Sequence, residues 1–318
     1  MKTPFSFSEF GNLDLLPLNL LSSMWLHEPD EGTLARASEE LHLPMVTPAE
    51  LAVAYTDLFL LNVYPYGTVF TDPSGELNGP GAERVGALFE RHGYHPPELG
   101  EAGAPDHLGL CLGFLALLAG KHEVSRGHFA SDFLAWAPVC CLAVEREPSA
   151  HVFHRALAAR TRETLLDKFS EKQESRTEFS TLVFRDSSPQ WPVEDEIRLR
   201  DILHFLLAPA RCGMFLSRSR LGELGRGLGQ RLPFSSRYDV AESLFAAAGQ
   251  SGQVEALLDR LAEEADAWET SYRAWADAYP AWADLSTQWT GRTQAARRTL
   301  NEMRALLSRP LELEEIDA

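Results

Sequence analysis

Several short stretches of the chain combine residues that act in catalytic or metal sites. His122-Glu123 is followed by Arg126, where the motif of a zinc protease needs a second histidine. Asp106-His107 places a carboxylate beside an imidazole, in the reverse order of the His-Asp pair of phosphohydrolases and without companions that would complete a ligand set. The sequence contains no Gly-x-Ser-x-Gly. These near misses give no support to an enzyme.

Other groupings are equally incomplete. Glu39-x-x-His42 is half of a di-iron motif whose second half is missing. His151 and His154 would share a helix face near Glu147, and an exposed histidine pair is favoured over a metal site. The glycines at 225, 227 and 229 lack the strand and the lysine of a phosphate-binding loop. We expect neither a metal nor another cofactor.

The Asp-His pair opens the most apolar stretch of the chain, residues 104–118 (APDHLGLCLGFLALL). Pro105 and Asp106 fit the first turn of a helix, where a missing N–H costs nothing and a carboxylate meets unpaired backbone N–H groups. Leucines follow at steps of three and four residues, including Leu112, which predicts a helix buried on most of its circumference. The pair is either the cap of a core helix, which the residue types favour, or a hinge beside an apolar groove.

Charge and composition restrict the class of protein and its partners. The chain has a net charge of −17, with 45% hydrophobic and 24% charged residues, which is typical of a soluble globular protein. Nucleic acid is not expected as a partner because binding it requires a basic face. An acidic surface attracts positively charged segments instead.

Neither the cysteines nor the N-terminus suggests export. The four cysteines form no C-x-x-C pair, and Cys140-Cys141 lie in apolar sequence, so we expect free thiols in a reducing compartment. The apolar stretch 13–26 is interrupted by Asp14, Pro17 and Asn19, unlike a signal peptide. No run approaches the roughly 20 apolar residues of a membrane span. The sequence predicts a cytoplasmic protein without membrane insertion.

Helical periodicity runs through the chain and nothing alternates as a strand, so the predicted fold class is all-α. Asp30 or Thr33 is expected to cap the second helix. The aromatic-rich segment 63–79 is too apolar for an ordinary surface loop and is expected to pack down or to line a site. The predicted helices span 17–27, 30–41, 48–62, 81–92, 104–118, 126–144, 150–169, 194–207 and 238–248.

The C-terminal part carries the strongest repeat. Trp268, Trp275, Trp282 and Trp289 are seven residues apart, within a heptad stripe from Val254 to Leu307 that is interrupted at Pro280. The stripe predicts either one helix kinked at the proline or two helices that share a face. Burial of the stripe against its own domain is favoured over an exposed docking strip for a partner.

Changes of composition divide the chain into three parts. Residues 170–193 are polar and contain Ser187, Ser188, Pro189 and Pro192, which is typical of a linker. We predict a first helical domain over residues 1–169, this linker, and a second helical domain over residues 194–318.

Motifs in the first domain resemble those of the TorD/DmsD/NarJ-like chaperones, which mature molybdenum oxidoreductases. The resemblance covers residues 15–166. Pro105-Asp106-His107-Leu108 carries the closest match. Cys111 stands where this family usually has Glu, and Asp132 where it usually has His. The other matching segments are YTDLF at 55–59, YPYGTVF at 64–70, Gly75-Glu76-Leu77, and FLAWAP at 133–138.

The resemblance implies a binding protein without turnover, which holds the twin-arginine signal peptide of a molybdenum-cofactor oxidoreductase subunit in its apo form until the cofactor is installed. The apolar part of the peptide is expected against Tyr55, Phe59, Tyr66 and Leu112. Its arginines are expected near Asp57, Asp72 or Asp106, with His107 at the same corner. Two rivals remain, a helical scaffold that joins folded partners through the tryptophan stripe and a hydrolase with an unrecognised site. Homodimerisation is left open.

Overall fold

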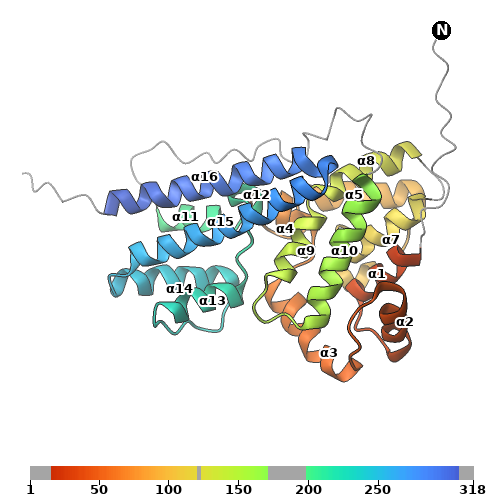
Figure 1. Cartoon of the computed structure of the whole chain (residues 1–318), viewed down its shortest axis with the longest axis horizontal. Coiled ribbons are helices and arrows are strands. Elements are labelled where there is room, and N and C mark those ends of the chain that lie inside the picture. The colour runs from red at the N-terminus through yellow and green to blue at the C-terminus, as the bar shows by residue number, and fades with distance from the viewer. Residues whose placement is uncertain (1–15, 120–122, 171–197, 308–318) are drawn as a thin grey trace, which may run out of the picture. The chain divides into compact units, whose positions relative to one another are not determined.

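The computed structural model describes residues 16–119, 123–170 and 198–307 (Figure 1). Within these ranges the regular secondary structure is helical, and the only extended pairing is an isolated antiparallel bridge between Tyr66 and His107. The predicted all-α fold is confirmed. None of the described helices is both long and apolar enough to cross a bilayer.

The chain divides into two compact units, which are described separately. Unit 1 comprises Met1–Asp186 together with Tyr279–Trp282, and unit 2 comprises Ser187–Ala278 and Ala283–Ala318. Of the predicted linker, residues 170–193, all but Ser170 lie outside the described residues.

Unit 1 starts with helices whose ends follow from local capping. Asp30 caps the second helix by accepting a hydrogen bond from the Thr33 backbone N–H at 2.7 Å. Thr47 and Glu50 form a reciprocal capping box at the N-terminus of the third helix. Trp25 of the first helix is fully buried, and its indole donates to the Thr161 hydroxyl. These helices are α1 (Leu16–Leu26), α2 (Glu31–Leu41) and α3 (Pro48–Tyr55).

The helix predicted over residues 48–62 changes its pitch part-way. After α3 the chain forms a π-helix, η2 (Thr56–Asn62), which ends with Val63 N donating to Leu58 O at 2.7 Å. A π-helix has i→i+5 hydrogen bonds and is rare, and π-bulges are frequent at functional sites. The apolar periodicity does not reveal this change because both helix types keep Leu58 and Phe59 buried.

The aromatic segment after η2 packs down, as predicted, and contains a short helix that the sequence did not indicate. This is α4 (Gly67–Thr71), whose residues are mostly buried. A longer amphipathic helix follows, with Phe89 buried and Gly93 in the left-handed conformation at its end. The elements here are α5 (Pro80–His92) and the single turn α6 (Leu99–Ala102).

Helix α7 (Leu108–Ala119) is at the centre of unit 1. Gly109 lets it approach α1 closely, since a Cβ there would lie 2.6 Å from Leu26 Cγ and 2.9 Å from Ser22 O. On other sides Phe114 contacts the Phe89 ring of α5 and the Phe129 ring of α8 (Glu123–Leu134), at 4.7 and 4.8 Å between centroids. The apolar stretch is therefore a core helix, as its sequence predicted.

The remaining helices of unit 1 enclose this core. Pro138 begins a new helix after α8 because it has no N–H to continue the hydrogen-bond ladder. Trp282, far along the chain, belongs to the same unit, and its indole donates to Leu134 O at 3.3 Å. These elements are α8 (Glu123–Leu134), α9 (Ala137–Glu145), α10 (Val152–Ser170) and the short η3 (Pro280–Trp282).

Unit 2 is built on two long helices that lie side by side (Figure 1). They run antiparallel, since Arg304 pairs with Asp259 and Gln294 Nε2 donates to Glu269. Pro280 thus separates two helices rather than kinking one. The helices of this unit are α11 (Leu199–Leu206), α12 (Pro209–Cys212), α13 (Arg218–Gly227), α14 (Arg237–Gln250), α15 (Val254–Ala278) and α16 (Ala283–Leu307).

Candidate functional site

Asp106 joins two segments that are far apart in the sequence. Its Oδ2 accepts a hydrogen bond from the Thr68 backbone N–H at 2.7 Å, and its carbonyl accepts from Gly67 N at 3.0 Å. Both donors are unpaired N–H groups in the first turn of α4. The sequence predicted that Asp106 would cap its own helix, and this is wrong, because α7 begins two residues later and the carboxylate faces α4.

His107 caps α7 in place of Asp106. Its Nδ1 accepts from Gly109 N at 3.1 Å, and its ring meets the Tyr66 ring edge-on at 5.0 Å between centroids. Leu108 N donates to Pro65 O at 2.7 Å, which continues the contact between the two segments. Burial, with a smaller contribution from His27, lowers the pKa of His107 to about 3, so the imidazole is neutral.

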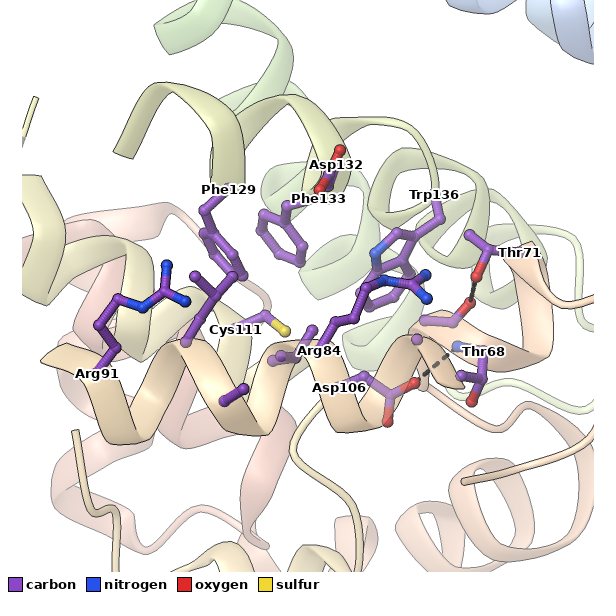
Figure 2. A pocket seen from close by; sticks show the side chains of 15 residues that line it. Thr68, Thr71, Arg84, Arg91, Asp106, Cys111, Phe129, Asp132, Phe133 and Trp136 are labelled. Atoms are coloured by element: carbon purple, nitrogen blue, oxygen red, sulfur yellow. Dashed lines mark hydrogen bonds between the residues drawn. The ribbon is translucent and has the colours of Figure 1, made fainter. Parts of the chain in front are cut away.

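A cavity of about 320 Å³ lies beside Asp106 in unit 1. Figure 2 shows Arg84 and Arg91 on one helix, α5. Across from them lie Phe129 and Phe133 of α8 and Trp136, which follows that helix. The remaining lining comes from α4, from α7 and from Asp106 in the turn before α7. The lining residues are Gly67, Thr68, Thr71, Gly81, Arg84, Val85, Ala87, Leu88, Arg91, Asp106, Cys111, Phe129, Asp132, Phe133 and Trp136.

The charged side chains that line this cavity are buried to different extents. Asp106 is 2% exposed, and its Oδ1 is buried without a hydrogen-bond partner. Burial raises the pKa of this carboxyl, while the bonds from Thr68 act in the opposite direction. Arg84, Arg91 and Asp132 are exposed and lie at the rim. The cavity can therefore take an apolar group, with a buried carboxylate at one end and both signs of charge at its mouth.

One comparison with known protein families matches the part of the chain that forms this cavity. A family model described as nitrate reductase delta subunit matches residues 24–141. Over these residues the chain is similar to that family. This is a family of chaperones that mature molybdoenzymes, and its members are not catalysts. No curated protein and no solved structure matches the chain.

Four of the predicted site residues lie at or near this cavity. Asp106 lines it, and His107 and Tyr66 pack directly behind Asp106. The Tyr66 hydroxyl donates to Ala102 O at 2.7 Å, which secures the segment before α4. Asp72 follows the end of α4, where its carboxylate accepts from the backbone and side chain of Ser74.

Three other predicted residues lie elsewhere in the same region. Tyr55 donates to Leu26 O at 3.0 Å, and burial raises its pKa to about 12. Phe59 is buried between the rings of Trp25 and His154. Asp57 lies at the start of η2 and is half-buried. This group forms the packing of α1, η2 and α10 rather than a wall of the cavity.

Leu112 lies inside the core of α7 and is fully buried. A peptide would reach its side chain only if unit 1 opened. The prediction that Leu112 contacts a ligand stays untested, and in this structure the residue serves packing.

Most of the cavity residues were not predicted as site residues. Arg84 and Arg91 are seven residues apart on α5, with Leu88 between them, a spacing that places all three on one helix face. This signal was present in the sequence, but nothing there related that face to α8. Cys111 and Asp132, which depart from the usual residues of the resembling chaperones, also line the cavity. All four cysteines are free and buried, and burial raises the pKa of the Cys111 thiol.

Two other expectations bear on rival functions. Among the described residues no group of three or more histidines, cysteines or carboxylates is arranged to hold a metal ion. The tryptophan stripe is buried at all four positions, with Trp268 and Trp289 almost inaccessible. Trp268, Trp275 and Trp289 are buried in unit 2, as predicted, whereas Trp282 is buried in unit 1 and not against the C-terminal domain. The four indole rings offer no exposed strip for docking.

Proposed function

We propose that unit 1 binds the N-terminal, twin-arginine-type leader of a molybdenum-cofactor oxidoreductase subunit and holds the apo subunit in the cytoplasm until the cofactor is inserted. The observation that carries the proposal is the cavity in the family region, which joins an apolar wall to a buried carboxylate with an oxygen free to accept hydrogen bonds. The client is a partner and not a substrate, since nothing in the site transforms it.

The chemistry of such a leader suits the two parts of the cavity. Its apolar residues would contact Val85, Leu88 and Phe133, where burial of hydrocarbon is favourable. A leader arginine near Asp106 or Asp132 would form a charge-assisted hydrogen bond, which is stronger than a neutral one. Arg84 and Arg91 can donate to backbone carbonyls of an extended peptide.

The departures at Cys111 and Asp132 support a client preference particular to this chain. A carboxylate at 132 attracts a cation, whereas histidine at that position is neutral over much of the physiological range. The neutral thiol of Cys111 makes the inner wall less polar than a glutamate would. We therefore expect a basic group in the leader close to α8.

Calorimetry with the leader of a client tests this proposal. The leader is expected to bind more weakly as salt increases, because exposed charges are screened beyond about 8 Å at physiological ionic strength. Asp106→Asn keeps an acceptor for the Thr68 N–H but removes the charge. It is expected to lower affinity for the arginine leader by about tenfold while leaving unchanged the weaker affinity for a leader with both arginines replaced by glutamine.

Asp132→Asn is the second variant, and Asp167→Asn on α10 is the matched control, since Asp167 is exposed and lies outside the cavity. The control is expected to bind as the natural chain does. Equal affinity of the natural chain for the arginine and glutamine leaders would overturn the electrostatic part of the proposal. Absence of binding to either leader would overturn the whole.

A further inference from the structure

Unit 2 carries an exposed aromatic ring beside arginines. Phe234 is 80% exposed, the most exposed of the large apolar side chains that the structure describes. The Arg218 guanidinium lies over its ring, 3.9 Å from the centroid. A cation stacked on a ring fixes the orientation of both groups and keeps the other guanidinium edges available for hydrogen bonds.

Helix α13 and the loop after it extend this surface. Arg226 folds back along α13, since a Cβ on Gly222 would lie 3.4 Å from its Nη1. Gly222 is one helical turn from Arg218, so the two guanidinium groups share a face. Leu232 anchors the loop against Gly225, and Arg231 precedes it and is exposed. We call Arg218, Arg226, Arg231 and Phe234 the arginine–phenylalanine surface.

Several other arginines of unit 2 pair with carboxylates. Arg220 pairs with Glu264, Arg297 with Asp266, and Arg304 with Asp259. Arg218, Arg226 and Arg231 form no ion pair with any described carboxylate. The chain holds 46 acidic and 29 basic residues, so a shortage of carboxylates does not explain this.

We propose that the arginine–phenylalanine surface binds an acidic polypeptide segment of a partner protein, with an apolar side chain of that segment packed on Phe234. One guanidinium group stacked on an exposed ring, with two further arginines on the same helix and the loop after it, complements carboxylates that flank a single apolar residue. The proposal concerns unit 2 alone and is independent of leader binding by unit 1.

Nucleic acid fits this surface less well. Binding a duplex draws on many phosphate contacts along an extended basic track, whereas here three arginines lie on one helix and the loop after it, on a chain of net charge −17. A short acidic segment needs only local complementarity, because the more distant negative charges of the protein are screened.

Fluorescence polarisation with the full chain tests the proposal. The probe is a labelled short peptide in which glutamates flank one leucine, and its control has glutamine at each glutamate position. The glutamate peptide is expected to bind and the glutamine peptide to fail. Arg218→Glu is expected to weaken binding by about tenfold or more. Phe234→Ser is expected to weaken it several-fold without changing the melting temperature, because the ring is exposed.

Arg298→Glu is the matched control. Arg298 is an exposed arginine of unit 2 on α16, outside the surface, and its replacement changes the net charge equally. Its affinity for the glutamate peptide should equal that of the natural chain. If Arg298→Glu and Arg218→Glu lost affinity for the glutamate peptide equally, net charge alone would explain the loss and the proposal would be wrong. Tighter binding of a single-stranded oligonucleotide than of the glutamate peptide would also overturn it.

The chain itself contains a competing acidic segment, LELEEIDA at residues 311–318, which lies outside the described residues. In the full chain, replacing Glu312, Glu314 and Glu315 by glutamine is expected to leave the affinity for the glutamate peptide unchanged. A gain of about tenfold would mean that the chain's own segment occupies the surface, and the partner proposal would be wrong.

Discussion

His107 and His154 are neutral in the folded chain for the same reason. Both are almost fully buried, and burial lowers the pKa of His107 to about 3 and that of His154 to about 4. An unfolded histidine titrates near 6.5. Between the folded and the unfolded pKa values the unfolded chain binds more protons, so the stability contributed by these residues is present above pH 6.5 and is lost as the pH falls.

This predicts an acid-labile unit 1. The free energy of unfolding should decrease by up to about 1.4 kcal/mol per pH unit for each histidine as the pH falls below about 6.5. His154→Phe retains a ring among Tyr55, Phe59 and Phe153 and should flatten this dependence. Urea unfolding at a series of pH values measures it. His42→Asn, at an exposed helix end, is the control, and a slope unchanged in His154→Phe would contradict the assignment.

At the scale of elements, the two long helices of unit 2 depend on the tryptophan stripe. Trp268 is 1% exposed, contacts the Tyr272 ring, and donates its indole N–H to Glu264 at 3.0 Å. Glu264 is itself buried and pairs with Arg220 of α13. The Trp268 side chain thus supports the α15–α16 contact directly and the attachment of α13 through Glu264.

Trp268→Ala is therefore expected to cost about 3–5 kcal/mol of stability, since it leaves a cavity and removes a donor from a buried carboxylate. Thermal melting followed by tryptophan fluorescence measures the loss. Thr270→Ala, at an exposed position of α15, should change melting little. A Trp268→Ala protein that melts with the natural one would contradict a structural role for the stripe.

At the scale of the whole molecule, the chain returns to unit 1 between the end of α15 and the start of α16. Trp282 is 2% exposed and hydrogen-bonded to Leu134, although 148 residues separate them. The integrity of unit 1 thus depends on a residue from the C-terminal part of the sequence.

Trp282→Ala should increase amide hydrogen exchange in α8 and α9, because it removes buried area and the bond to Leu134 O. Trp282→Phe, which retains a ring without the N–H, should give a smaller increase. Exchange that rises only in α13 and α14 would show that Trp282 supports unit 2 instead.

Local sequence determined much of the fold. Asp30 capped α2 as predicted because a cap acts across three residues. The helices and the buried stripe followed from spacings of three and four, since helical neighbours are set by the chain itself. The resemblance of the first half to a chaperone family also rested on short motifs and was confirmed by the match over residues 24–141.

Tertiary structure decided what these elements do together. Asp106 caps α4, 38 residues before it, and no local rule selects such a partner. Leu112 lies inside the core because α7 is covered on several sides, whereas the leucine spacing alone cannot say which sides face neighbours. The cavity needs α4, α5, α7 and α8 at once. Periodicity fixes a helix and its faces, but which faces meet depends on packing across long separations in the sequence.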